Sequence, residues 1–272
     1  MSNVFYFTDI HGMGQLYDTI IDFCIKQDPQ CTIIFGGDAC DRGPDGYRIM
    51  KDLLSRTNVI YLLGNHELLF INAARAVKRY YEGIEPISPA YHDDVFLHSY
   101  NGGKPTLDAW QNDGMPTDIL AKLEELPLIC SYKNFDFCHA GGHPKRFQML
   151  EQHEEYATED DINHCTWDRN CLGFGWIPNR ICVFGHTPVI HLAAKYYQQD
   201  KSLAAAHPCK YTGFLDDKWT GAKIDMDTCA CGNGRAYVLN CDTLQAYGFR
   251  DTDFDNQEIH KHNIEQFEVI QL

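Results

Sequence analysis

The sequence predicts an α/β fold, and three observations support this class. Short apolar runs alternate with longer helical segments through the first eighty residues, a pattern typical of parallel βαβ units. The short runs are apolar along their whole length, as expected for strands in a sheet that is covered on both faces. The chain of 272 residues is also long enough to bury a sizeable core without disulfides.

The first half of the chain supplies the elements of this α/β pattern. The expected strands cover residues 4–7, 32–35 and 59–62, and the expected helices cover residues 15–26, 47–54 and 67–80. In the first helix Leu16, Ile20 and Phe23 recur at the spacing of one helical face. These elements would form a parallel sheet whose strand ends lie along one edge.

The sequence pattern changes in the middle of the chain. Proline and glycine interrupt residues 84–116, which indicates short helices joined by a long connection. We therefore expect a single domain over residues 1–272, with a helical and loop cap inserted at about residues 68–127 beside the functional site.

The second half is expected to contain more strand. Residues 128–132 and 135–138 should form a hairpin around Lys133-Asn134, and residues 181–184 a buried strand. A second hairpin should join residues 236–240 to 246–249, and a final strand should cover 267–270.

Composition restricts the functions that this chain can have. The formal net charge of -15 opposes binding to duplex nucleic acid or to an anionic membrane surface. No apolar run approaches the ~20 residues of a membrane span. The 12 cysteines are scattered, without a Cys-x-x-Cys pair, which favours reduced thiols in a cytoplasmic protein over disulfides or a structural zinc site. The charge also implies that a phosphate enzyme of this composition needs bound cations at its site.

Metal-capable side chains follow five of the expected strands. Each set places Asp, Asn or His next to glycine, in residues 8–12, 36–43, 64–67, 137–142 and 184–188. Because the carboxyl ends of parallel strands converge on one crevice, these segments are expected to meet in space. Mixed oxygen and imidazole ligands suit Mn, Fe or Zn better than Ca.

The motifs resemble those of the PPP-type serine/threonine phosphatases in the calcineurin-like metallophosphoesterase superfamily, especially the compact bacterial and phage members. They are Asp-x-His-Gly, Gly-Asp-x-x-Asp-Arg-Gly, Gly-Asn-His-Glu and two later histidines, in order, across residues 8–187. Thr8 stands where the family usually has glycine. The resemblance implies an α/β/β/α fold, in which two mixed β-sheets form a sandwich flanked by helices.

The resemblance also implies a dinuclear metal centre, with Mn expected and Fe or Zn as alternatives. The implied ligands are Asp9 and His11 for the first ion, Asn65, His139 and His186 for the second, and Asp38 as the bridge. A hydroxide shared by the two ions would attack the phosphorus atom.

Four further residues are assigned by the same resemblance. His66 would protonate the leaving oxygen, and Asp41 would orient it. Arg42 would clamp the phosphate from one side and Arg169, in a Trp-x-Arg segment, from the other. Arg180 lies nearby in the sequence and stays open as an alternative second clamp.

The expected activity is hydrolysis of phosphomonoesters, with a phosphorylated protein or a small phosphoester as substrate. One rival is a dinucleoside polyphosphate hydrolase, a relative that usually has alanine where this chain has Asp41. A rival of another class is a catalytically inactive binding module, but no implied ligand has been lost. We expect the remaining histidines, among them His98, to be solvated or incidental, and Asp227 to be structural. The sequence predicts no oligomeric state.

Overall fold

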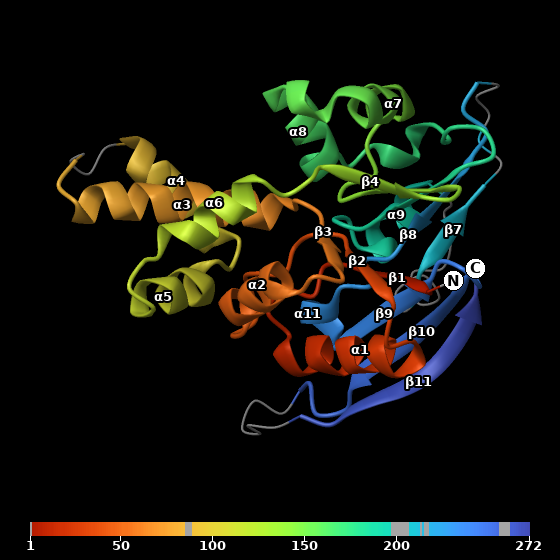
Figure 1. Ribbon diagram of the computed structural model, residues 1–272, viewed down its shortest axis with the longest axis horizontal. Helices are drawn as coiled ribbons and strands as arrows, with labels where there is room; N and C mark the ends of the chain where they lie inside the picture. Colours follow the sequence, from red (N-terminus) through yellow and green to blue (C-terminus); the bar gives the residue numbers. More distant parts are fainter. Residues whose placement is uncertain (1, 85–88, 197–206, 213, 215–217, 256–261) are drawn as a thin grey trace.

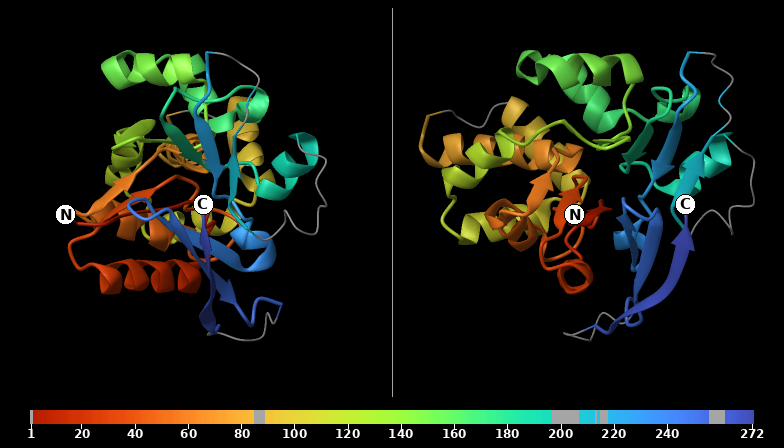
Figure 2. Two further views of the ribbon diagram at one scale, coloured as in Figure 1. Left: turned by 90° about the vertical axis from the view of Figure 1, so that its right-hand side faces the viewer. Right: turned by 45° about the vertical axis from the view of Figure 1, so that its right-hand side comes forward.

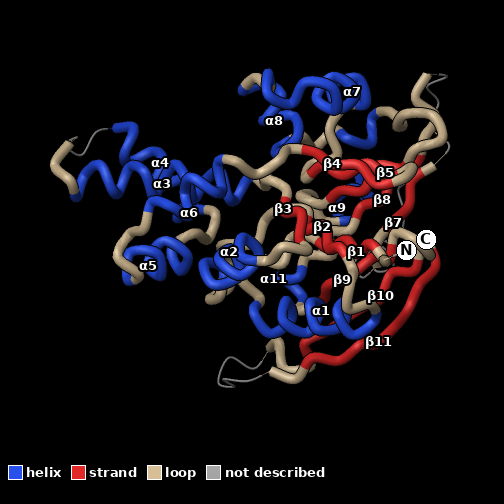
Figure 3. The backbone as a smooth tube through the Cα atoms, viewed as in Figure 1, coloured by secondary structure: helices blue, strands red, loops and turns tan. Residues whose placement is uncertain are grey.

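The computed structural model describes residues 2–84, 89–196, 207–212, 214, 218–255 and 262–272. Two mixed β-sheets lie face to face, with helices outside them, as expected (Figures 1 and 3). In Figure 3 the strands occupy the middle of this arrangement, between α1 (Gly14–Gln27) on one side and α7 (Pro144–His153) with α8 (Glu159–Trp167) on the other.

The first sheet has six strands. Their order is β11 (Ile264–Gln271), β10 (Gln245–Asp251), β9 (Arg235–Asn240), β1 (Val4–Phe7), β2 (Thr32–Phe35) and β3 (Val59–Tyr61). Strands β1, β2 and β3 are parallel, whereas β9 runs antiparallel to β1. The parallel half therefore presents three carboxyl-terminal strand ends at one edge, as the alternation in the sequence predicts.

The second sheet has five strands. Their order is β4 (Ile129–Tyr132), β5 (Phe135–Cys138), β6 (Ile181–Phe184), β8 (Ala222–Asp225) and β7 (Cys209–Tyr211). Strands β5, β6 and β8 are parallel. Two more strand ends, those of β5 and β6, are thereby added to the three of the first sheet.

Aromatic and aliphatic side chains fill the space between the two sheets. Tyr6 of β1 stacks on Phe137 of β5, with ring centroids 5.1 Å apart. Ile34 and Val183 belong to the same buried cluster. Separate clusters lie under the helices of each sheet. The four layers are therefore held by three apolar interfaces, each of which removes apolar surface from water.

The helices that follow β1, β2 and β3 are α1, α2 (Gly46–Ser55) and α3 (Asn65–Tyr81). Helix α3 packs against α4 (Pro89–Tyr100), α5 (Lys104–Asn112) and α6 (Thr117–Glu124). These helices extend to one side, away from β10 and β11, as Figure 1 and the right-hand view of Figure 2 show. Trp110 is buried there, edge-on to Phe70 at 6.0 Å. We call α4–α6 with the end of α3 the helical lobe.

Both predicted hairpins are present, β4–β5 around Lys133-Asn134 and β9–β10. The elements that escaped prediction include the helices α7, α8 and α9 (Val189–Tyr196) and the strands β7 and β8. Strand β8 contains a buried lysine, Lys223. Its side chain lies over the rings of Phe174 and Trp176. No helix among the described residues has the length and apolarity needed to cross a membrane.

Candidate metal centre

Four of the predicted metal ligands stand at sharp left-handed turns of the backbone. The φ angles are +54° at Asp9, +44° at His11, +59° at Asp38 and +67° at His186. Non-glycine residues seldom adopt this conformation, which costs free energy and concentrates at functional sites. Each turn comes directly after a buried strand, so the side chain is directed into the space above the strand ends.

Asp38 lies at the centre of two overlapping groups of possible ligands. One group contains His11 and His66, and the other contains His139 and His186, with all ligand atoms of a group within 4.8 Å of one another. The carboxylate Oδ2 is 3.5 Å from His11 Nε2, and Oδ1 is 3.4 Å from His139 Nε2. The two oxygens thus face opposite halves of the site, as a bridging carboxylate requires.

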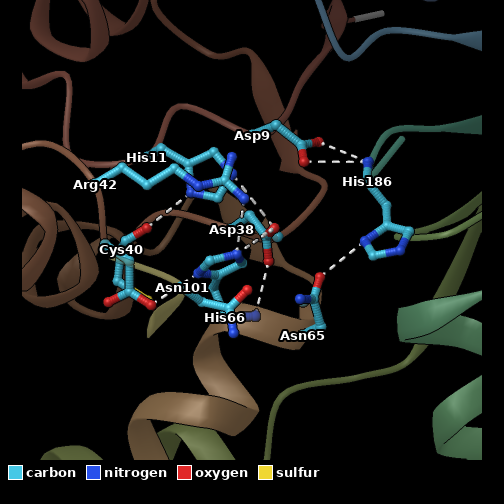
Figure 4. A network of polar contacts seen from close by, with 12 residues as sticks. Asp9, His11, Asp38, Cys40, Arg42, Asn65, His66, Asn101 and His186 are labelled. Carbon is cyan, nitrogen blue, oxygen red and sulfur yellow. Dashed lines mark hydrogen bonds and ion pairs between the residues drawn. The ribbon is translucent and has the colours of Figure 1, made fainter. Parts of the chain in front are cut away.

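Asn65 and Asp9 connect these groups (Figure 4). The Asn65 side-chain oxygen lies 3.0 Å from His139 Nε2 and 2.8 Å from His186 Nδ1. Both oxygens of Asp9 accept the His186 backbone N–H at 3.1 Å. Thr8, the one departure from the expected motif, donates its hydroxyl to Asp9 at 2.6 Å. All six predicted ligands therefore lie in one buried region.

The electrostatics of this region suit divalent cations. Burial raises the pKa of Asp9 to about 6 and that of Asp38 to about 7. Burial also lowers the pKa values of His139 and His186, which keeps these imidazoles neutral. The Nε2 atom of His186 is buried and has no hydrogen-bond partner in the described part of the chain. Buried carboxylates beside neutral imidazoles form a donor set that fits transition-metal ions.

Glu67 supports the loops that carry these ligands. Its carboxylate accepts the backbone N–H groups of Asp38 at 2.9 Å, Ala39 at 2.8 Å and Gly64 at 3.0 Å, and the hydroxyl of Tyr61 at 2.7 Å. A carboxylate at the first turn of α3 also complements the helix dipole. No function was predicted for Glu67, although its place in Gly-Asn-His-Glu was the available signal.

The predicted proton donor lies at the other end of the site. His66 Nδ1 is 2.8 Å from Asp41 Oδ2. Burial alone would raise the pKa of Asp41, but hydrogen bonds from His66 and His98 outweigh it and lower that pKa. Burial alone would lower the pKa of His66, but Asp38 and Asp41 raise it. The pair is therefore an ionised carboxylate beside an imidazole that holds its proton more tightly than usual.

Arg42 lies across this end of the site (Figure 4). Its Nη2 is 3.0 Å from His66 Nε2, and its Nη1 is 3.5 Å from the sulfur of Cys231 in α11 (Ala230–Asn233). A guanidinium can donate to Nε2 only when that nitrogen carries no proton. A phosphate that attracts Arg42 would therefore free Nε2 for a proton.

The two candidates for the second arginine lie in different places. Arg169 donates to the hydroxyl of Thr187 at 3.0 Å, and its charge contributes, after burial, to the lowered pKa of the adjacent His186. Arg180 instead pairs with Asp136 and with Glu151 on the second sheet. Of the two, Arg169 is the one beside the metal ligands.

His98 corrects one expectation from the sequence. It is fully buried rather than solvated, and its Nε2 lies 2.9 Å from Asp41 Oδ1. The sequence around it, in α4, is polar and gave no signal of burial. All 12 cysteines are free thiols, and no possible metal cluster in the described part of the chain includes one.

Asp227 is buried in the turn after β8. Its carboxylate accepts the backbone N–H of Cys229 at 2.8 Å, and its own N–H donates to Asp225 at 3.0 Å. These contacts give it a structural function in the loop before α11. Among the described residues, neither Asp225 nor Asp227 belongs to a cluster that could hold a further metal ion.

Comparison with known proteins places this site in a family. A curated relative, the symmetrical bis(5'-nucleosyl)-tetraphosphatase of Buchnera aphidicola subsp. Schizaphis graminum (strain Sg), is 26% identical over 173 residues, 63% of this chain and 55% of the relative. The chain thus spans about half the length of that protein.

Two solved structures can be superposed on most of this chain. A protein provisionally named a diadenosine tetraphosphatase superposes with a TM-score of 0.49 at 20% identity, over 88% of each chain. A metallophosphoesterase from Sphaerobacter thermophilus gives a TM-score of 0.48 at 13% identity, over 88% of this chain and 84% of the other.

The family model described as calcineurin-like phosphoesterase matches residues 2–216. This range includes every strand-end motif that contributes a predicted ligand. With the α/β/β/α layers and the buried cluster of Asp, Asn and His side chains, the match means that the chain belongs to the calcineurin-like phosphoesterase family.

Proposed function

We propose that this phosphoesterase is a metal-dependent phosphatase of the serine/threonine protein phosphatase type, which hydrolyses phosphomonoesters at a dinuclear centre. The observation that carries this proposal is the buried Asp41–His66 pair, with its 2.8 Å contact, directly beside the carboxylate of Asp38. A phosphomonoester with an alkoxide leaving group needs a proton at that oxygen, and this pair is arranged to supply it.

The residues proposed to hold the metals are Asp9 and His11 for one ion, Asn65, His139 and His186 for the other, and Asp38 for both. We propose Mn as the native metal, with Fe and Zn as the alternatives that this donor set also suits. When bound, two divalent ions supply charge neutralisation at the phosphate and lower the pKa of a water molecule that they share.

The remaining proposed site residues bind the phosphate group or transfer the proton. Arg42 and Arg169 lie near opposite groups of ligands, beside His66 and beside His186 respectively. Two guanidinium groups can hold a phosphate by paired, charge-assisted hydrogen bonds. His66 then donates its Nε2 proton to the leaving oxygen, while Asp41 retains the Nδ1 hydrogen bond and stabilises the positive imidazolium before transfer.

The second candidate is hydrolysis of dinucleoside polyphosphates. The name of the curated relative at 26% identity favours it. In that reaction the leaving group is a nucleotide phosphate, which departs as a stable anion and depends little on an acid. The two candidates therefore make different demands on His66, although they share the metal centre.

A substrate panel tests the proposal. The Mn²⁺-loaded protein is assayed with a phosphoserine peptide, p-nitrophenyl phosphate and diadenosine tetraphosphate, and its metal content is measured in parallel. We expect both monoesters to be hydrolysed, with kcat/KM for the peptide above that for the tetraphosphate. A preference of ~10-fold or more for the tetraphosphate would support the second candidate. Bound metal without hydrolysis of any substrate would support an inactive binding module.

We also propose a cytoplasmic location. The support is chemical, because all 12 cysteines are free thiols, and free thiols persist in reducing compartments. Oxidised, disulfide-bonded protein isolated from its native cells would contradict this location.

A further inference from the structure

The helical lobe reaches into the site through one side chain, that of His98. This residue stands near the end of α4 and is 0% exposed. Its ring lies 5.9 Å from that of Phe70. On the other side, a Cβ atom at Gly103 would come within 2.1 Å of His98 Nε2. The imidazole therefore occupies a fitted slot, made by a phenyl ring and by a glycine that leaves room for it.

From this slot His98 contacts the carboxylate that holds the proposed proton donor. Its Nε2 lies 2.9 Å from Asp41 Oδ1, while His66 Nδ1 lies 2.8 Å from Asp41 Oδ2. The two oxygens of one carboxylate thus have separate imidazole partners. Rotation of the Asp41 carboxylate would break both contacts together.

The protonation of His98 follows from its surroundings. Its Nδ1 atom is buried and has no hydrogen-bond partner among the described residues, whereas Nε2 faces a carboxylate oxygen. Because a carboxylate only accepts, Nε2 must carry the hydrogen and donate it.

The lobe also holds the backbone around Asp41. The Asp41 N–H donates to the hydroxyl of Thr106 at 2.9 Å, and the Arg42 N–H donates to the Gly102 carbonyl at 2.8 Å. Both Asp41 and Arg42 have left-handed backbone, with φ of +69° and +64°. Such a pair of residues persists only where neighbouring groups fix it, and here the α4–α5 turn and the first part of α5 supply those groups.

We propose that His98 is a positioning residue for proton transfer, and that the helical lobe thereby forms part of the catalytic machinery rather than a cover alone. This inference rests on the proposed function of His66 as general acid. His98 touches neither substrate nor metal. It holds the Asp41 carboxylate at the rotation that presents Oδ2 to His66, and so fixes the tautomer and direction of the His66 imidazole.

This function has a consequence that a general loss of stability would not have. Proton donation matters most when the leaving oxygen is basic. Removing His98 should therefore slow substrates with poor leaving groups and spare those with good ones. Binding of the phosphate should not change, because Arg42 and the metal ligands remain.

The test compares His98→Ala with His98→Gln on two substrates. The Nε2 amide of glutamine can reach the same place as histidine Nε2 and donate to Asp41. For His98→Ala we expect kcat to fall ~10–100-fold on phenyl phosphate, part of the ~10²–10⁴-fold span of general acid catalysis, and less than ~3-fold on p-nitrophenyl phosphate. KM should stay constant on both. For His98→Gln we expect most of the loss on phenyl phosphate to be restored.

Two further variants separate positioning from damage to the lobe. Leu107→Ala, a buried residue of α5, should lower the thermal midpoint without changing the ratio of the two kcat values. In a His66→Asn background, His98→Ala should cause no additional loss, because both changes remove one function. Equal losses on the two substrates, a glutamine variant as slow as the alanine variant, or additive losses in the double variant would each overturn the proposal.

Failure of this inference is distinguishable from failure of the proposed function. An inactive wild-type protein with Mn²⁺ bound would contradict the phosphatase function itself. An active wild-type enzyme for which His66→Asn, but not His98→Ala, selectively slows phenyl phosphate relative to p-nitrophenyl phosphate would contradict only the function proposed for His98.

Discussion

The two ends of the site are built from different parts of the fold. At the metal end, the proposed ligands come from short loops at the ends of five strands, and most of these residues have left-handed backbone. At the proton-donor end, Asp41 and His66 depend on contacts from the helical lobe, through His98 and Thr106. The first end is specified by local sequence motifs, whereas the second needs a tertiary contact between segments 57 residues apart.

This difference predicts that substitutions at the two ends fail in different ways. At the metal end, loss of a ligand should remove the cations and all activity together. At the proton-donor end, substitutions should leave the cations in place and slow a single step. The following predictions run from the largest expected effect to the smallest.

Asp38→Asn should have the largest effect. It removes the one charge shared by both halves of the metal end, so metal content should fall and activity should drop by more than ~10³-fold, beyond the usual effect of losing a single active-site hydrogen-bond donor. Metal analysis and p-nitrophenyl phosphate turnover measure this. Asp136→Asn is the matched control, because Asp136 is equally buried but lies against Trp176 and Arg180. Retention of both metals in Asp38→Asn would show that the bridge is misassigned.

His66→Asn should act on proton transfer alone. We expect full metal content and a kcat that is ~10²–10⁴-fold lower on phenyl phosphate. His66 also lies in one of the two possible ligand groups, with Nε2 3.9 Å from Asp38 Oδ2. If the variant loses metal as Asp38→Asn does, His66 is a ligand and the proposed division of the site is wrong.

Arg169→Lys should weaken phosphate binding, since a single ammonium cannot reproduce a planar pair of donors. We expect KM to rise ~10-fold, with little change in metal content. Arg180→Lys serves as the control, because Arg180 pairs with Asp136 and Glu151 instead. Steady-state kinetics with inorganic phosphate as a competitive inhibitor distinguish the two. A larger effect for Arg180→Lys would reverse the assignment.

The affinity for Mn²⁺ should fall as the pH is lowered. In the metal-free protein the pKa of Asp9 is raised to about 6 and that of Asp38 to about 7, so both carboxyls carry protons at pH 5. A cation must displace those protons, at a cost of ~10-fold in affinity per proton per pH unit. The lowered pKa values of His139 and His186 keep these imidazoles from adding to the effect. Titration calorimetry in buffers of different ionisation enthalpy counts the released protons, and binding without proton release at pH 5 would contradict the raised pKa values.

Much of the fold follows from pattern, and its gaps have a physical cause. The strands at residues 4–7, 32–35 and 181–184 are apolar apart from Thr32 and are present as expected. Strand β8 was not predicted because it contains Lys223, and lysine side chains are usually exposed at the surface. In the fold its charge is compensated by the carbonyl oxygen of Cys171 and by two aromatic rings, partners that no local pattern reveals.

The site shows the same division between local and tertiary information. The convergence of the six proposed ligands was predictable because each stands in a short motif at a strand end, and strand ends converge. His98 was not predictable, because a histidine among polar residues of α4 has no local mark of burial. Its significance depends on Gly103 and Phe70, which leave a space for the ring beside Asp41.

The most direct test of the central claim is an anomalous difference map from crystals of the Mn²⁺-loaded protein. Two peaks ~3.5–4 Å apart, both within bonding distance of Asp38, are the expected result. His66 should then lie outside the coordination sphere of either ion. A single peak, or a peak coordinated by His66 Nε2, would contradict the dinuclear centre with a separate proton donor.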